Sequence, residues 1–224
     1  MRNDENEAKN YGDLAYGEAI RAVAGGRKGQ ISPEAFLRVE LQAGISADNP
    51  VFRALGRATA VQMAGRGFRS VLDFGAGTGV YADAFHQMGF EIRAFEIWEE
   101  HRAYIREKFP HIRLVDAPFS AELMLFIETA EHMTDQELRD LFGRISPAYI
   151  LFSSTSQRTE WDEEWGHINV KSQPEWGRFF ESVGYVQAGG LAAPTPWSRL
   201  FRRKKVPLRL RLLESWRRLF RFKR

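Results

Sequence analysis

The stretch Val71-Leu-Asp-Phe-Gly-Ala-Gly-Thr-Gly79 decides how this chain folds. Apolar residues lead into three glycines at alternate positions, which is typical of a short buried strand that turns sharply into a helix. Glycine lets the backbone turn and approach a ligand without hindrance from a side chain. The N-terminus of the helix beyond it favours an anionic group. The sequence therefore predicts a strand over 70–74, a ligand-binding turn and a helix over 80–88.

The spacing of these glycines excludes two familiar phosphate-binding loops. A dinucleotide fingerprint, G-x-G-x-x-G, needs glycine at position 80, where the chain has Val80. A phosphate-cradling loop ends in Gly-Lys-Ser or Gly-Lys-Thr, and that ending is absent here. The turn must therefore serve another ligand or simply join a strand to a helix.

Strands and helices alternate on both sides of the turn. Further strands are expected at 91–97, 112–115, 123–127 and 149–153, and further helices at 99–108, 135–142 and 174–183. Weaker strand patterns near 185–188 and 198–203 suggest an antiparallel edge. Together these elements predict an α/β fold of the Rossmann-like, doubly wound type, with a mostly parallel seven-stranded sheet and an antiparallel edge strand.

Helical signals precede the sheet, and a basic segment follows it. A helical pattern spans 13–24, and Ser32-Pro33 and Asn49-Pro50 each combine an N-cap with proline at the first helical position. We therefore expect an N-terminal helical extension over 1–66, a main domain over 67–206 and a basic amphipathic tail over 207–224.

Composition and charge point to a single cytoplasmic domain with an unusual tail. The 224 residues include no cysteine, and the polar N-terminus lacks the apolar core of a signal peptide. From Arg199 to Arg224 there are 12 Lys or Arg and one acid, a balance of +11. The other residues hold 20 basic and 28 acidic side chains, a balance of −8. An acidic body is thus joined to a basic tail.

The order Asp-x-Gly-x-Gly-x-Gly, which begins at Asp73, resembles motif I of class I S-adenosylmethionine-dependent methyltransferases. The likeness extends over most of 68–190. It implies that S-adenosylmethionine is the cofactor and that the glycines leave room for its methionine part. The implied loop residues are Asp73, Gly75, Ala76, Gly77 and Gly79. An ordinary strand-turn-helix junction is the structural alternative.

Two further acids fit the same resemblance. Glu96 ends the next expected strand, and an acid about 20 residues beyond such a loop can accept hydrogen bonds from ribose hydroxyls. The resemblance makes Glu96 the ribose-binding acid, with Ile97 beside it. It also implies that Asp116 meets the adenine amino group, with Ala117 alongside. A helix-start carboxylate and a loop aspartate are the structural alternatives.

The segment Glu128-Thr-Ala-Glu131-His132 places two carboxyls and an imidazole at positions that converge in a helical turn. It resembles the E-x-x-E-H segment of ubiquinone-biosynthesis O-methyltransferases and of small-RNA 3′-end 2′-O-methyltransferases. In those groups a second histidine beyond the fifth strand completes a divalent-ion site, and His167 holds the corresponding place. The resemblance implies that Glu128, Glu131, His132 and His167 bind Mg²⁺ or Mn²⁺, and Glu128 is also expected at the cofactor.

Two alternatives to a metal remain open at this segment. His132 or His167 would act as a metal-free general base and take a proton from the acceptor. In the other alternative, Glu131 and His132 only cap the following helix.

The polar insert over 157–176 is the expected acceptor side. Trp161, Trp165 and Trp176 lie among acids and amides, and aromatic faces with hydrogen-bonding groups suit sugars or other polar rings. The alternative is that these tryptophans lock a lid onto the core. Ser153, Ser154 and Thr155 end the fifth strand and would face the acceptor or cap the sheet.

The tail over 207–224 carries apolar residues at roughly helical spacing among arginines. Such a helix suits an anionic membrane surface, which would make the cytoplasmic protein peripheral at the inner membrane. Docking on the acidic body, RNA binding and pairing with a partner helix are the competing uses.

The sequence as a whole predicts an enzyme that methylates a hydroxyl of a small molecule, such as a sugar or a lipid-linked intermediate. Small-RNA 2′-O-methylation is one alternative, although the acidic body makes nucleic acid an unlikely partner. A non-catalytic, cofactor-binding partner subunit is another. Methylation of an amine also stays open, because a metal-free histidine site would serve one.

Overall fold

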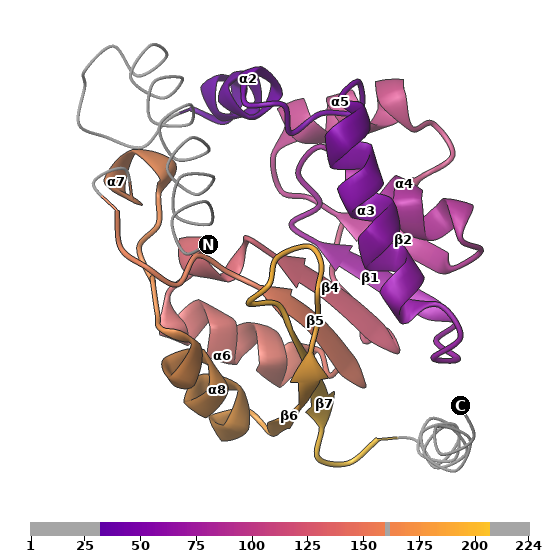
Figure 1. Ribbon diagram of the computed structural model, residues 1–224. Helices are drawn as coiled ribbons and strands as arrows, with labels where there is room; N and C mark the ends of the chain where they lie inside the picture. Colours follow the sequence, from indigo (N-terminus) through magenta and orange to yellow (C-terminus); the bar gives the residue numbers. More distant parts are fainter. Residues whose placement is uncertain (1–31, 160–161, 207–224) are drawn as a thin grey trace, which may run out of the picture.

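The computed structural model describes residues 32–159 and 162–206 (Figure 1). The expected helix over 13–24, Trp161 and the basic tail over 207–224 lie outside the described residues. Within them, no helix combines the length and the hydropathy that crossing a membrane requires.

Seven strands form one sheet in the order β3-β2-β1-β4-β5-β7-β6. The expected α/β fold is confirmed, with parallel pairing from β3 through to β5. The reversed strand is β7, which pairs antiparallel with β5 on one side and β6 on the other. It therefore lies one place inside the edge rather than at it. The strands are β1 Ser70–Phe74, β2 Glu91–Phe95, β3 Arg113–Val115, β4 Leu123–Ile127, β5 Tyr149–Ser153, β6 Tyr185–Gly190 and β7 Arg199–Arg203.

The strand order reverses between β1 and β4, so the chain leaves β1 towards one edge and later returns on its other side. In open parallel sheets, ligands bind beyond the carboxyl ends of the strands at this switch point. The helices are α2 Pro33–Gln42, α3 Pro50–Met63, α4 Val80–Gln87, α5 Glu99–Lys108, α6 Asp135–Arg144, α7 Asp162–Trp165 and α8 Gln173–Ser182, and Ala130–His132 forms the 3₁₀ helix η1.

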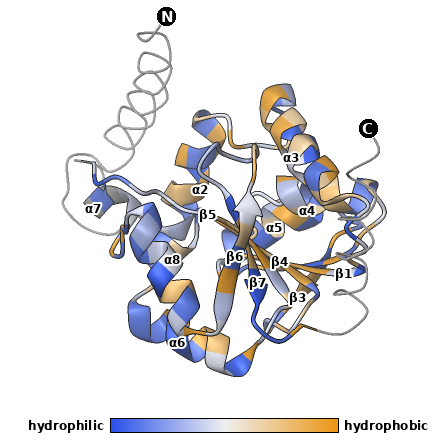
Figure 2. Cartoon of the chain, turned by 60° about the horizontal axis from the view of Figure 1, so that its bottom comes forward, coloured by the Kyte–Doolittle hydropathy of each residue, from blue (hydrophilic) through white to orange (hydrophobic). Residues whose placement is uncertain are grey.

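Alternate residues of the strands feed two hydrophobic layers. In β4, Leu123 and Leu125 join the layer with α3, α4 and α5, whereas Met124 and Phe126 join the layer with α6 and α8. Figure 1 shows these two groups of helices on opposite sides of the sheet. The strands are largely hydrophobic, and the helices mix apolar and polar residues (Figure 2). Near-continuous apolar strands are typical of a parallel sheet covered on both faces.

Helix starts follow the capping signals in the sequence. The Ser32 hydroxyl accepts a hydrogen bond from the Ala35 N–H at 3.3 Å, and the Asn49 side chain accepts one from the Val51 N–H at 3.0 Å. Each cap satisfies a backbone donor that the helix itself leaves without a partner. The two helices of the N-terminal extension, α2 and α3, are therefore encoded locally. How far this extension forms a separate unit stays a prediction.

The α3 helix packs on α4 through Gly56, where an added Cβ would lie 3.3 Å from atoms of Val80 and Ala84. The α2 helix instead reaches α5 through an ion pair between Glu40 and His101. The extension thus contacts α4 and α5 through two different helices.

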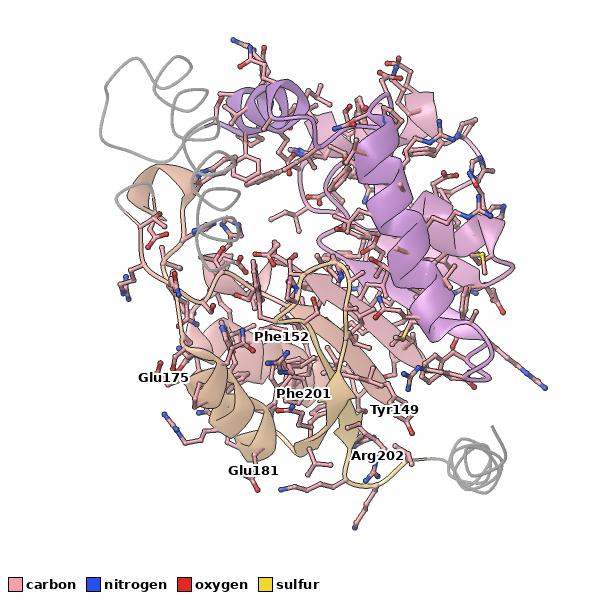
Figure 3. The ribbon with its side chains drawn as sticks, in the orientation of Figure 1. Tyr149, Phe152, Glu175, Glu181, Phe201 and Arg202 are labelled. Atoms are coloured by element: carbon pink, nitrogen blue, oxygen red, sulfur yellow. The ribbon has the colours of Figure 1, made fainter. Side chains whose placement is uncertain are left out.

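Of the two roles that the sequence left open for Trp176, contact with a ligand is wrong. Its side chain is 0% exposed and packs in the α8 layer, with its ring centroid 5.1 Å from that of Phe152. Phe152 of β5 and Phe201 of β7, both labelled in Figure 3, lie in the same layer with ring centroids 5.9 Å apart. Trp176 is a core residue because α8 turns it inward with Phe180.

Trp176→Ala is expected to lower the free energy of unfolding by about 3–5 kcal/mol, because it leaves a cavity in a close-packed layer. Chemical denaturation followed by circular dichroism measures this loss. Trp165→Ala is the matched control: Trp165 is only partly buried, and its change should cost clearly less. Equal losses in the two variants would contradict the assignment of Trp176 to the core.

Candidate functional site

A cavity of about 600 Å³ lies at the carboxyl ends of β1, β2, β4 and β5. Its wall comes from α2, the glycine turn, the end of β2, η1 and the segment that follows β5. This volume lies within the range of small-molecule sites, roughly 300–1,000 Å³. Ionisable side chains of the wall include Glu40, Glu96, His101, Glu128, His132 and His167.

The three glycines of the turn have positive φ angles but face different surroundings. At Gly75 an added Cβ would lie 2.5 Å from Thr129, and at Gly79 it would lie 2.8 Å from Ile105. At Gly77 the nearest atom would be the Glu40 Oε1, 3.7 Å away. Gly75 and Gly79 therefore let neighbouring elements pack against the turn. Gly77 leaves open space at the cavity wall.

Glu96 is 5% exposed and holds the turn in place. Its Oε2 accepts a hydrogen bond from the Gly77 N–H at 2.9 Å. Its Oε1 accepts two more, from the N–H groups of Ile97 at 2.8 Å and Trp98 at 3.0 Å. The carboxylate at the end of β2 thus connects the glycine turn to the start of α5 while it lines the cavity.

Asp73 is buried behind the turn, with 3% of its surface exposed. Burial, followed by the charge of Glu96, raises the pKa of its carboxyl to about 7. No protein atom among the described residues hydrogen-bonds its Oδ2. A carboxyl oxygen that is buried without a partner costs free energy unless a ligand or water meets it.

Glu128 and Glu131 form a carboxyl pair at the end of β4. Glu131 is 0% exposed and accepts hydrogen bonds from the Ser154 hydroxyl at 2.9 Å and the Thr155 N–H at 3.1 Å. Glu128 lines the cavity and accepts hydrogen bonds from the hydroxyls of Ser153 and Thr155. Loss of hydration raises the pKa of both carboxyls, and the charge of Glu131 helps to raise that of Glu128 to about 8. The polar residues at the end of β5 thus donate the hydrogen bonds that hold both carboxyl groups.

The two candidate histidines lie beside each other, with ring centroids 4.9 Å apart. The Asn169 N–H donates to the Glu131 carbonyl at 2.9 Å and so docks the insert after β5 onto η1. The His132 Nδ1 bonds the Gly166 carbonyl at 3.2 Å, and burial, followed by the charge of His167, lowers its pKa to about 4. His132 is therefore neutral near pH 7.

His167 has a carboxylate partner, since its Nδ1 lies 3.1 Å from the Asp162 Oδ1. Asp162 is itself fixed by the Thr159 N–H at 2.9 Å and the Thr159 hydroxyl at 3.1 Å. Burial lowers the pKa of His167, and the Asp162 hydrogen bond opposes that shift. Because a carboxylate only accepts, Nδ1 carries the proton and Nε2 of the neutral ring keeps a lone pair.

Aromatic rings close the cavity from the side of α2. The ring centroid of Phe36 lies 5.0 Å from those of both Trp98 and Trp165, and 6.0 Å from that of His132. Trp165 in turn stacks on His167 at 6.4 Å with an interplanar angle of 16°. A single side chain of α2 therefore touches both the glycine-turn half and the histidine half of the wall.

Solved structures share this architecture. Human N-acetylserotonin methyltransferase, in complex with SAM, aligns with a TM-score of 0.57 and 14% identity, over 78% of this chain and 57% of its own. The mitomycin 7-O-methyltransferase MmcR aligns at 0.55 and 17%, over 76% and 57%. SAM-bound CalS10, an amino pentose methyltransferase from Micromonospora echinaspora, aligns at 0.51 and 14%, over 67% and 91%. The chain has the fold of the class I S-adenosylmethionine-dependent methyltransferases.

The chain matches no protein-family model and no curated protein sequence. It spans a little over half the length of the mitomycin and N-acetylserotonin methyltransferases, so the likeness concerns one part of each.

The residues present suit the cofactor of this methyltransferase fold. Gly77 leaves space for a ligand against the backbone, and Glu96 lines the cavity and bonds the Gly77 N–H. Asp73, whose buried Oδ2 lacks a partner among the described residues, lies outside the cavity wall. Ala76 and Gly79 are buried and lie outside the cavity wall. Ile97, in contrast, is 71% exposed and belongs to it.

Asp116 and Ala117, expected near an adenine, do not line the cavity. Asp116 is exposed and its carboxylate lies 2.7 Å from the Arg102 guanidinium. Asp116 therefore holds the loop after β3 against α5.

The residues do not fit the expected Mg²⁺ or Mn²⁺ site. Across residues 32–159 and 162–206, no three His, Asp or Glu side chains are grouped so that they could hold a metal ion. Glu131, which was expected as a ligand, has both carboxyl oxygens bonded to Ser154 and Thr155 instead. Glu128, His132 and His167 line the same cavity as separate polar groups.

Several residues of the cavity wall belong to no motif in the sequence. Phe36, Glu40 and His101 lie on helices that were expected, but no motif marked these side chains. Asp162, the partner of His167, was one of several acids in the insert. The signal that could have marked His101 is its place as a polar residue on the inward face of α5. In the structure it is 1% exposed and bonds Glu40 at 2.7 Å.

Gly77→Ala is expected to weaken S-adenosylhomocysteine binding by tenfold or more, because the new methyl group would project into the cavity. Isothermal titration calorimetry measures the affinity. Gly89→Ala is the control, since Gly89 also has a positive φ, 83°, but its Cβ would meet nothing. The two variants should lose similar stability, so an equal affinity in both would contradict the placement of Gly77.

The Tm of Asp73→Asn is expected to rise relative to that of the natural chain as pH increases from about 4 to about 7. The raised pKa means that the folded chain favours neutral Asp73; that stabilisation is present below the unfolded pKa and is lost as pH rises through about 7. Asparagine stays neutral throughout. Over this pH range, the free energy of unfolding of Asp73→Asn should rise by about 2–4 kcal/mol relative to that of the natural chain. Parallel pH profiles of the two proteins, measured without ligand, would contradict this prediction.

Proposed function

We propose that this protein is an S-adenosylmethionine-dependent methyltransferase that methylates a hydroxyl group of a small molecule without a metal ion. One observation carries the proposal: a single cavity joins the glycine turn and Glu96 to His132 and His167. The glycine turn and Glu96 suit the cofactor, and the two imidazoles suit removal of a proton from the acceptor. Methyl transfer needs little more than alignment of the reacting groups and a base.

At the cofactor half, Glu96 is proposed to bind the ribose hydroxyls through lone pairs that its backbone contacts leave available. The bound cofactor supplies a methyl group on a positively charged sulfur. Gly77 gives the backbone of the turn room to lie against it, and Trp98 and Ile97 form the adjoining wall.

At the acceptor half, His167 is proposed as the general base. Its Nε2 would take the proton of the acceptor hydroxyl as the oxygen accepts the methyl group that the bound cofactor supplies. Asp162 holds the Nδ1–H and stabilises the imidazolium that forms. His132, whose pKa is about 4, is a weaker base and would instead accept a hydrogen bond that orients the hydroxyl.

The wall also supports a small cyclic acceptor. Phe36, Met133, Trp165 and Trp197 provide apolar surface near the histidines, while Thr155 and Thr159 provide hydroxyls. The similar solved structures include a mitomycin 7-O-methyltransferase and an amino pentose methyltransferase. A ring that carries a free hydroxyl, such as a sugar or a phenol, is therefore the proposed class.

His167→Ala is expected to lower kcat by about 10²- to 10⁴-fold, the usual contribution of a general base, with S-adenosylhomocysteine affinity unchanged. Asp162→Asn should act in the same direction more weakly. The measurement is formation of S-adenosylhomocysteine with the hydroxylated acceptor that a panel of sugars and phenols identifies. His111→Ala is the control, because His111 is 41% exposed and lies outside the cavity wall.

Full activity of His167→Ala would exclude this base. Loss of activity on complete chelation, with recovery on addition of Mn²⁺, would overturn the metal-free mechanism. An acceptor that carries only an amine would redirect the proposal to N-methylation.

A further inference from the structure

The α2 helix places one carboxyl directly over the glycine turn. The Glu40 Oε1 is the atom closest to where a Gly77 side chain would begin, at 3.7 Å. Its other oxygen, Oε2, bonds the His101 Nε2 at 2.7 Å. Glu40 and His101 come from α2 and α5 and meet at the cavity wall, where both are lining residues. None of the sequence motifs points to this pair.

Carboxyl groups gather at this end of the cavity. Glu40 and Glu96 line it and Asp73 lies behind the turn, whereas no lysine or arginine among the described residues lines the cavity. Burial raises the pKa of Glu40, and the charge of Glu96 adds to this, while His101 opposes it. Carboxylates held together away from water are costly unless a cation joins them. The electrostatics of this wall therefore favour a positively charged ligand group.

The hydrogen-bonding pattern points to the same kind of ligand. The His101 side chain is 1% exposed, and its Nδ1 has no hydrogen-bond partner among the described residues. When the neutral ring donates Nε2–H to the Glu40 carboxylate, Nδ1 is left as an acceptor. Because His101 holds Oε2, Oε1 is the Glu40 oxygen that faces the turn and can accept a hydrogen bond from a ligand there.

We propose that Glu40, positioned by His101, binds the α-ammonium group of the amino-acid part of the cofactor. This inference rests on the proposed function, because it concerns the ligand of the same cavity. An ammonium group carries a full positive charge and N–H donors, which match the Glu40 carboxylate and the acidic wall. A ribose hydroxyl matches less well, since it is neutral and Glu96 already lies at the end of β2.

Two ligands separate this role from a general effect on the site. S-adenosylhomocysteine carries the amino acid, whereas 5′-methylthioadenosine has the same adenine, ribose and thioether without it. Glu40→Gln is expected to weaken S-adenosylhomocysteine binding by tenfold or more and to change 5′-methylthioadenosine binding by less than about twofold. Calorimetry on the full chain measures both affinities.

Glu34→Gln is the matched control on the same helix. Glu34 lies in the first turn of α2, is 76% exposed and pairs only with Arg38 among the described residues, so its change should leave both affinities unaltered. Equal binding of S-adenosylhomocysteine by Glu40→Gln and the natural chain would overturn the inference. So would an equal loss for both ligands, which would indicate a ribose contact or a structural effect.

If Glu40→Gln does not fold, the natural chain still decides the question. Deaminated S-adenosylhomocysteine should bind it at least tenfold more weakly than S-adenosylhomocysteine does, and equal affinities would refute the ammonium site. Binding of neither nucleoside by the natural chain would instead remove the proposed function itself, and this inference with it.

Discussion

The site depends on one backbone constraint, the turn between β1 and α4 that only glycines can make. Gly75 and Gly79 have positive φ angles and admit no Cβ, because Thr129 and Ile105 already occupy that space. The turn therefore fixes how closely the end of β4 and the α5 helix approach β1. Glu96 completes this arrangement by accepting the N–H of Gly77 at 2.9 Å. The position of the cofactor half of the cavity follows from these contacts.

The acceptor half has no comparable local rule and is assembled by contacts between distant segments. Asn169 docks the insert on η1, and the Gly166 carbonyl and Asp162 then orient the two histidines. The carboxyl pair at the end of β4 accepts hydrogen bonds from hydroxyls at the end of β5. Parallel strands bring these segments to the same edge of the sheet, which is why residues far apart in sequence share one wall.

The difference between these halves explains what the sequence could predict. Strands, helix starts and the glycine turn are local patterns, so the order of elements and the parallel sheet followed from them. The role of Trp176 stayed open, because polar neighbours in sequence do not reveal that α8 turns it into the core. Asp116 was expected at the cavity, but its loop faces Arg102 instead. Glu40 could not be foreseen, since its role depends on how α2 lies across the turn.

The contacts of Phe36 join the two halves of the cavity wall. Its ring touches Trp98 on the cofactor side and His132 and Trp165 on the acceptor side. A displacement of α2 large enough to admit one molecule would therefore remove wall from both compartments at once. The two halves of the wall thus share one aromatic side chain, so a shift of α2 would reshape both of them together, although their polar groups follow different strands.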